Sequence, residues 1–299
     1  MFFYVLILLI IKNFNVYKSD WNYYNKERYN QFYSVWKVEK VKRNKRWYDN
    51  PYVPWILPIV LIVLWQILGQ FQIITSSILP TPVEVIKAGI SLWGTGDLQE
   101  HVWISTQRAI IGFVIGGTLG FILGLFNGTI LFFERVIDTS IQMIRTIPHL
   151  ALIPLVILWF GIGESAKIFL VGIGVMFPIY INTFNGIKNV DRKLVEMGSV
   201  YGLNKWLLFR NIILPGALPS ILVGVRYALG VMWTSLIVAE TIGADAGIGF
   251  LATNGREFMQ MDIVVLTIVL YAILGKLSDF LAKLLEQRFL KWNPAYRRD

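Results

Sequence analysis

The chain has 299 residues, of which 55% are hydrophobic and only 16% charged, and it contains no cysteine. A typical soluble domain has about 25% charged residues, so the composition argues against a soluble enzyme, a DNA-binding domain and a disordered tail. Without cysteine there are no disulfides, thiolate metal sites or cysteine nucleophiles, and two histidines, His101 and His149, offer little to a metal. In a membrane protein, the net charge of +9 indicates basic cytoplasmic loops and gives no support to a nucleic-acid partner.

The first 52 residues are predicted to form a cytoplasmic N-terminal extension. Residues 1–11 are apolar but only about half the length of a membrane span, and Lys12 follows where a signal peptide would have a cleavage site. The rest of the extension is rich in Asn, Tyr, Lys and Trp, which is typical of an interfacial or loosely ordered tail. A translation start further downstream is the alternative.

Residues 53–299 are predicted to form an all-α membrane domain with six transmembrane helices. In hydrocarbon every backbone amide must be bonded within its own segment, so long apolar runs have to be helical. The predicted spans are 53–71, 109–131, a Pro-interrupted third at 141–160, 168–187, 218–242 and 263–285.

Lys and Arg residues orient these spans. They concentrate before the first span, between spans four and five, and after span six. With six spans and the N-terminus inside, all three basic regions face the cytoplasm, so both termini are expected there.

Two local patterns stand out between the first and third spans. Pro80-Thr81-Pro82 predicts a Pro-started helix outside the membrane over residues 83–92. Glycine recurs at every fourth position in the second span, at Gly112, Gly116, Gly120, Gly124 and Gly128. Such a ridge lets another helix approach closely. The pattern leaves open whether that contact is static or slides during a transport cycle.

The most informative stretch joins spans four and five, at about residues 188–218. Asp191 is predicted to cap a short helix that runs through Tyr201, and Gly202 to allow a sharp turn. A second short helix is expected to end at Pro215. Apolar residues alternate with charged ones, which is typical of an amphipathic helix–turn–helix. A linker resting on lipid headgroups would have the same composition.

The spacing of this loop resembles the signature of permease subunits of bacterial ABC-type importers. The matching positions are Glu196, Met197, Gly198, Gly202, Ile212, Leu214 and Pro215. Met197 departs from the pattern, which prefers Ala there. Stretches such as Arg145-Thr-Ile-Pro-His-Leu-Ala-Leu-Ile-Pro-Leu and Ala239-Glu240-Thr-Ile-Gly-Ala resemble the nitrate/sulfonate/taurine/bicarbonate branch, and Lys291-Trp-Asn-Pro-Ala-Tyr296 its aliphatic-sulfonate permeases.

The resemblance implies the fold of a type I importer permease, located in the bacterial inner membrane. It also implies that the loop docks on a separate ATPase, and that two permease copies and an extracytoplasmic substrate-binding protein complete the system. The sequence has no Gly-x-x-x-x-Gly-Lys-Ser/Thr motif. ATP and Mg²⁺ are therefore expected to bind the separate ATPase, and this chain is expected to bind no cofactor.

Residues expected along a translocation path are Pro148, Pro154, Thr234, Ser235 and Glu240. The prolines permit a kinked helix beside a cavity, and the hydroxyls suit an anion that must be released. Glu240 is either a gate or interhelix hydrogen bond, or a structural cap at the outer end. Arg226 either faces an anion path or snorkels to headgroups, and Lys276 and Asp279 are expected to neutralise each other.

Two other function classes remain as alternatives. A secondary transporter or channel, working without an ATPase, would favour paired repeats and ionisable groups at mid-membrane; the sequence has no convincing repeat. An intramembrane enzyme would need a nucleophile, an acid/base pair or a metal cluster, for which the sequence offers almost no residues.

Overall fold

The computed structural model describes residues 52–293, all but the side chains of Pro54, His149 and Leu150. The predicted extension at residues 1–52 therefore lies outside the described residues, apart from Tyr52. The chain forms two compact units, Met1–Ile62 and Val63–Asp299. In the first unit the described residues enter helix α3 at Val53.

The described residues are helical almost throughout. The helices are α3 (Val53–Gln70), α4 (Pro82–Thr95), α5 (Asp97–Thr129), α6 (Leu131–Phe133), α7 (Thr139–Thr146), α8 (Ile153–Phe160), α9 (Glu164–Lys188), α10 (Arg192–Val200), α11 (Lys205–Leu208), α12 (Leu214–Glu240), α13 (Ile248–Glu257) and α14 (Met261–Phe289). Two π-helical turns, η2 (Glu134–Asp138) and η4 (Phe209–Ile213), and a 3₁₀ turn, η3 (His149–Leu152), interrupt them.

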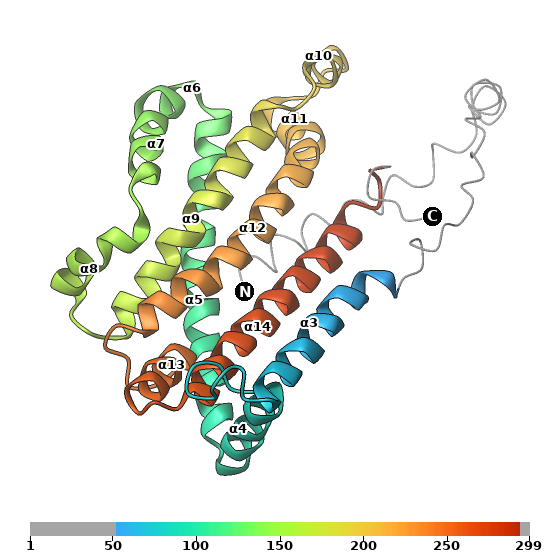
Figure 1. The fold of residues 1–299 in the computed structure, drawn as a ribbon. Coiled ribbons are helices and arrows are strands. Elements are labelled where there is room, and N and C mark those ends of the chain that lie inside the picture. Colours follow the sequence, from blue (N-terminus) through green and yellow to red (C-terminus); the bar gives the residue numbers. More distant parts are fainter. Residues whose placement is uncertain (1–51, 294–299) are drawn as a thin grey trace. The chain divides into compact units, whose positions relative to one another are not determined.

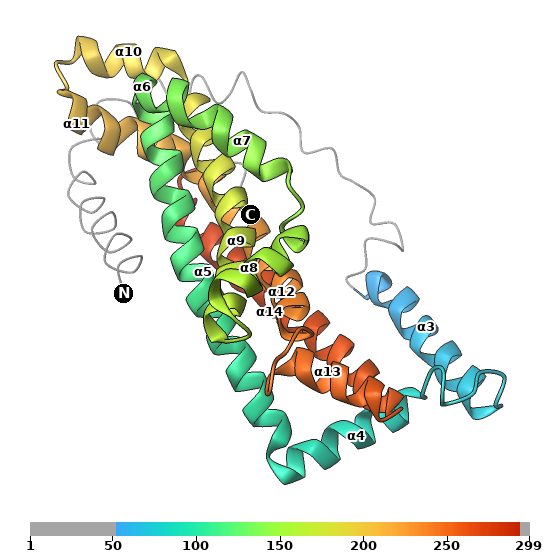
Figure 2. The same cartoon turned by 90° about the vertical axis from the view of Figure 1, so that its left-hand side faces the viewer.

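Four helical stretches of the described chain are long and apolar enough to cross a membrane. They are Asp97–Thr129, Glu164–Lys188, Lys205–Glu240 and Met261–Phe289, and the apolar stretch Trp55–Gln70 is shorter. Figures 1 and 2 show α5, α9, α12 and α14 running between two ends of the second unit, with α10 and α11 at one end and α13 at the other.

The helix predicted over residues 83–92 is confirmed as α4, whereas its location outside the membrane stays a prediction. Thr81 caps it: its Oγ1 accepts from the amide of Glu84, and the Glu84 carboxylate accepts from the amide of Thr81 in return. This reciprocal capping box satisfies two amides that the first helical turn leaves unbonded. Pro82 stands at the start of the helix, where a missing amide proton does no harm.

The glycine ridge of α5 packs against α9, which confirms the predicted close helix contact. A Cβ on Gly120 would lie 2.3 Å from the carbonyl oxygen of Met176, and one on Gly124 would lie 2.7 Å from that of Tyr180. No side chain fits at such positions, so the two backbones touch along several turns.

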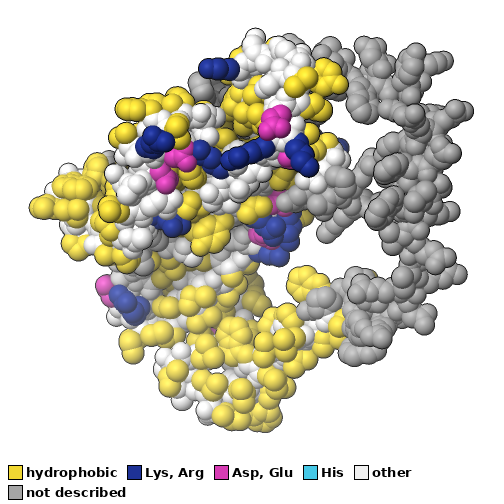
Figure 3. Space-filling view, turned by 90° about the horizontal axis from the view of Figure 1, so that it is seen from above, with side chains coloured by type: hydrophobic (Ala, Val, Ile, Leu, Met, Phe, Trp, Pro, Cys, Tyr) yellow, Lys and Arg dark blue, Asp and Glu magenta, His cyan; other side chains and the backbone are white. Residues whose placement is uncertain are grey.

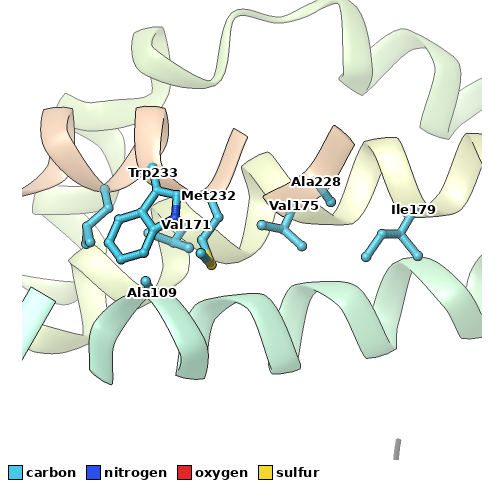
Figure 4. Packing of buried hydrophobic residues seen from close by; sticks show 8 residues of the cluster. Ala109, Val171, Val175, Ile179, Ala228, Met232 and Trp233 are labelled. Atoms are coloured by element: carbon cyan, nitrogen blue, oxygen red, sulfur yellow. The ribbon is translucent and has the colours of Figure 1, made fainter. Parts of the chain in front are cut away.

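The central hydrophobic cluster lies where α5, α9 and α12 meet. Its buried residues are Ala109, Val171, Val175, Ile179, Ala228, Met232, Trp233 and Leu236. Figure 4 shows Ala109 on α5 facing Val171 on α9 and Trp233 on α12. Small residues on α5 and larger ones on its neighbours bring the three helices close together, which gives the unit a common core.

The helix that carries the predicted second span begins before the apolar run. The apolar run suggested a start at residue 109, but α5 starts at Asp97. Its first turns carry polar residues, so they are not recognised as part of an apolar run. The acidic side chains of Asp97 and Glu100 interact favourably with the helix N-terminus. The helix therefore extends beyond the apolar run.

The third span is interrupted by proline, as predicted, but the interruption is a complete break and not a kink. Helix α7 ends at Thr146, a 3₁₀ turn follows, and α8 starts again at Ile153. Ile147 precedes a proline and has φ −72° and ψ 122°, because the ring of Pro148 disfavours the α conformation for the residue before it. Pro154 lies in the first turn of α8, where proline is tolerated.

The predicted helix end at Pro215 is wrong. Helix α11 passes through the π-turn η4 into α12 without a break. In the π-turn the amide of Leu214 bonds the carbonyl of Phe209, five residues back. In a regular α-helix the ring of Pro215 would clash with the carbonyl four residues back, and the wider turn accommodates it.

Candidate functional site

The loop singled out by the sequence forms a capped helix followed by a tight turn. Asp191 accepts a hydrogen bond from the amide of Lys193 at 2.9 Å and so caps α10, as predicted. At the other end, Gly202 has φ +77°, and the amides of Gly202 and Leu203 bond the carbonyls of Ser199 and Gly198. These are the two bonds of a Schellman motif, which requires a left-handed residue.

Two residues of the signature meet across this turn. A Cβ on Gly198 would lie 2.5 Å from Cδ1 of Ile212, which stands in the π-turn η4. Leu208 and Leu203 contact the same spot from α11 and the turn. The spacing between Gly198 and Ile212 therefore corresponds to a direct contact that fixes how α10 lies on the helix leading to the membrane.

The outer surface of this loop exposes both charged and apolar side chains. Glu196 is exposed, and its carboxylate has no hydrogen-bond or ion-pair partner among the described residues. Several large apolar side chains are exposed beside it: Met197, Val200, Tyr201 and Trp206, with Val200 at 86%. Figure 3, which views this end of the molecule, shows Lys and Arg side chains among apolar ones. Such a mixed surface favours docking of another protein chain.

Four of the predicted path residues differ in exposure. Pro148 and Pro154 are exposed, and so is Thr234, whose hydroxyl donates to the carbonyl of Val231. Ser235 is 1% exposed and packs on α9, where a Cβ on Gly174 would lie 2.4 Å from its Oγ. The structure therefore does not bring the five residues together on one exposed face.

The fifth, Glu240, is 1% exposed and makes interhelix hydrogen bonds, one of the two roles considered from sequence. Its carboxylate pairs with Arg108 of α5, with 2.8 Å between Oε1 and Nη1. Arg108, which is itself only 5% exposed, was not among the site residues predicted from the sequence. The available signal was its position: an arginine directly before an apolar run has to find a partner or reach water.

The expected pairing of Lys276 with Asp279 is present, but it belongs to a larger cluster. The nearest cation to Asp279 is Arg226 of α12, at 2.7 Å, whereas Lys276 lies 3.7 Å away on its own helix. Lys283 and Glu286 extend the cluster along α14. A guanidinium can bond a carboxylate in its plane, so Arg226 links α12 to α14 here.

Within residues 52–293 there is no group of three or more His, Cys, Asp or Glu side chains that could hold a metal ion. The arrangement as a whole exposes apolar and charged side chains at the α10 end and holds charged groups between its helices. Neither feature supplies a nucleophile with a neighbouring base.

A comparison with protein families matches residues 116–291 to the family described as "Binding-protein-dependent transport system inner membrane component". Among solved structures, one titled "Crystal structure of an amino acid ABC transporter with histidines" superposes with a TM-score of 0.56 at 18% identity. It covers 67% of this chain and 97% of its own. At that identity the likeness concerns the fold.

Curated relatives are similar over most of their length. The "Putative aliphatic sulfonates transport permease protein SsuC" of Escherichia coli (strain K12) is 60% identical over 243 residues, which is 81% of this chain and 92% of that protein. The protein of the same description from Bacillus subtilis (strain 168) is 43% identical, covering 81% and 87%. The "Taurine transport system permease protein TauC" of Escherichia coli (strain K12) is 30% identical, covering 78% and 87%.

Proposed function

The chain belongs to the inner-membrane components of binding-protein-dependent transport systems, and we propose that it is the permease subunit of an ATP-driven importer of aliphatic sulfonates. The observation that carries the substrate is the 60% identity to a relative described as an aliphatic sulfonates permease, over 92% of that relative. The relative described as a taurine permease is 30% identical. Taurine is itself a sulfonate, so both substrates share the same anionic group.

Membership of the family fixes the coarse features. The chain is a non-catalytic, multi-pass component of the inner membrane, no cofactor is expected for it, and its system includes an ATPase and a substrate-binding protein. We propose that the ATPase docks on the exposed surface of α10 and α11 around Glu196. The glycine turn and the contact between Gly198 and Ile212 support this, because they make α10 a rigid extension of the helix that enters the membrane.

We further propose six spans, a cytoplasmic α10 end and a homodimer. Basic residues gather in and around the α10 loop, as they do in cytoplasmic loops generally. The two helices α7 and α8 would together form the third span, with α3 as the first. The partly exposed side chains of Lys276 and Lys283 on α14 support a second copy, because lipid solvates such charges poorly.

The path is proposed to pass between the two copies. Thr234 supports this, since it places an exposed hydroxyl on a spanning helix. Pro148 and Pro154 are also exposed, and they lie on either side of the 3₁₀ turn at which the α-helix is interrupted. Ser235 and Glu240 are buried in this conformation, so their contribution would require a rearrangement of α12. Alternating access, with outward opening driven by the ATPase, would supply one.

Growth of a deletion strain tests the proposed substrate. The strain should lose growth when an alkanesulfonate is the sole sulfur source, and should grow normally on sulfate. Taurine and nitrate, as sulfur and nitrogen sources, serve as comparison substrates. Loss of growth on nitrate alone, or no loss of growth on any substrate, would contradict the proposal. As a control, a plasmid copy of the gene must restore growth.

A further inference from the structure

One face of α5 carries three polar side chains at the end opposite α10. His101, Ser105 and Arg108 are spaced by four and then three residues, so they lie on the same side of the helix. All three bond the segment that leads into α13. Arg108 Nη1 donates to the carbonyl of Ala246 at 2.5 Å, and the amide of Gly247 donates to His101 Nδ1 at 3.0 Å.

The next two amides are bonded in the same way. The amide of Ile248 donates to Ser105 Oγ at 2.8 Å, and that of Gly249 to Glu240 Oε2 at 2.9 Å. Helix α13 has no capping side chain of its own, since its N-cap is Gly247. The first amides of a helix need acceptors from elsewhere. Here α5 and α12 provide them, so the position of α13 depends on these two helices.

The carboxylate of Glu240 lies at the centre of this arrangement. It accepts from Ser105 Oγ at 2.7 Å, from Arg108 Nη1 at 2.8 Å and from the hydroxyl of Tyr271 on α14 at 3.2 Å. A buried carboxylate needs a cation and hydrogen bonds to remain charged. Arg108 is that cation, and it also donates to Glu164 at the start of α9.

We call Ser105, Arg108, Glu164, Lys167 and Glu240 the outer polar cluster. Lys167 lies 3.2 Å from Glu164, so two cations and two carboxylates face one another. The pair with Glu240 is buried, whereas the side chain of Glu164 is 58% exposed. A buried ion pair often stabilises a fold no more than apolar residues of the same volume would. The Arg108–Glu240 pair therefore contributes mainly by fixing the positions of the segments that it bonds.

Two glycines allow the chain to wrap around this pair. Gly247 has φ +122°, and a Cβ there would lie 2.5 Å from Oε1 of Glu240 and 2.7 Å from Nη1 of Arg108. A Cβ on Gly249 would lie 2.5 Å from Cβ of Glu240. The segment thus follows the contour of the Arg108–Glu240 pair, and any displacement of the pair would displace the segment.

The segment and α13 present a surface at this end of the molecule. Asp245, Arg256 and Glu257 are exposed, and Phe258 and Met259 project from the turn after α13 with 68% and 72% exposure. Figure 1 shows α13 at the end of the second unit away from α10. With the α10 end in the cytoplasm, this surface faces the side from which a loaded binding protein arrives.

We propose that Arg108 is a positioning residue for import. Through Glu240 and Ala246 it holds residues 241–247 and α13 in the orientation that receives the loaded binding protein. This inference rests on the proposed function. Arg108 does not touch the substrate; it acts through the surface that it orients.

Arg108→Lys tests the inference, because lysine keeps the charge beside Glu240 but, with three donors on a single nitrogen, cannot make the four hydrogen bonds of the arginine fork to Glu164, Glu240 and Ala246. The variant is reconstituted into vesicles with its ATPase, and binding protein loaded with an alkanesulfonate is titrated. The basal ATPase rate and the maximal stimulated rate should stay at the wild-type level. The binding-protein concentration for half-maximal stimulation should rise by roughly tenfold or more.

Two further variants complete the design. Ser105→Ala removes one hydrogen-bond partner of Glu240 and of Ile248. It should raise the half-stimulating concentration of binding protein by a smaller factor. This variant provides the test if the Arg108→Lys complex does not assemble. Arg135→Lys, at an exposed position on η2, is the matched control and should match wild type.

Three outcomes overturn the inference. The first is an unchanged half-stimulating concentration in both cluster variants. The second is a proportional fall of basal and stimulated rates, which would indicate a purely structural role. The third is a wild-type complex that the binding protein does not stimulate at all, which overturns the proposed function and this inference with it.

Discussion

At the scale of single residues, the closest backbone approach lies at Gly116 of α5. A Cβ there would lie 2.0 Å from the carbonyl oxygen of Gly172. Gly116→Ala should therefore push α5 away from α9 and destabilise the protein by about 1–3 kcal/mol, the usual cost of overpacking. The thermal unfolding midpoint of the purified protein in detergent measures the effect.

Gly275→Ala is the control for this prediction, because Gly275 lies inside α14 with nothing within 4 Å of the position of its Cβ. Alanine is the better helix former, so this variant should be as stable as wild type or slightly more stable. Equal midpoints for the Gly116 and Gly275 variants would contradict the close packing of α5 on α9.

The sequence predicted close helix packing in the membrane core better than it predicted which polar side chains bond one another. A glycine at every fourth position indicates a close helix contact, and the structure has one. In contrast, nothing in the sequence joins Arg108 to Glu240, which is 132 positions away. Glu240 was singled out from the sequence and Arg108 was not, because pairing is set by how the helices pack and no local pattern encodes that.

At the scale of elements, the turn after α10 should decide whether the loop transmits force. Gly202 has φ +77° and nothing within 4 Å of the position of its Cβ, so a substitution acts through conformation alone. The left-handed conformation costs other residues about 1–2 kcal/mol. Gly202→Ala should therefore misplace α10 and abolish the ATP hydrolysis stimulated by substrate and binding protein, while the protein stays in the membrane.

Gly202→Asn provides the rescue, because asparagine adopts the left-handed conformation more readily than alanine. It should retain more stimulated hydrolysis than Gly202→Ala in the same reconstituted complex. Glu196→Gln should also lose stimulation, whereas Glu100→Gln, at an exposed position on α5, should not. Full coupling in both the Gly202→Ala and Glu196→Gln variants would refute docking at this loop.

The elements themselves were predictable wherever a local cause exists. The Pro-started helix over residues 83–92, the cap at Asp191 and the turn at Gly202 follow from short-range chemistry, and each is found. Prolines proved ambiguous: Pro148 ends a helix, whereas Pro215 lies within one because a π-turn precedes it. A π-turn leaves no clear mark in the sequence, so the unbroken course from α11 to α12 could not be foreseen.

At the scale of the whole molecule, the absence of cysteine makes the orientation directly testable. Val200 on α10 and Phe258 after α13 are 86% and 68% exposed, and they lie at opposite ends of the second unit (Figure 1). In intact spheroplasts, a membrane-impermeant maleimide should label the Phe258→Cys variant. It should label the Val200→Cys variant only after the membrane is permeabilised.

The unmodified chain is the background control, since it has no thiol to label. Labelling of Val200→Cys in sealed cells would reverse the proposed orientation, and with it the side on which the ATPase docks. Labelling of both variants only after permeabilisation would place α13 inside the cell and contradict six spans.

The break between α7 and α8 has a consequence for the life of the chain before assembly. Residues 147–152 are not α-helical, and Ile147 is 45% exposed. Non-helical backbone is tolerated at membrane depth only where protein or water covers it. A newly made copy that has not met its proposed second copy would present this polar backbone to lipid. Pairing would then contribute to the stability of each copy in the membrane as well as forming the path.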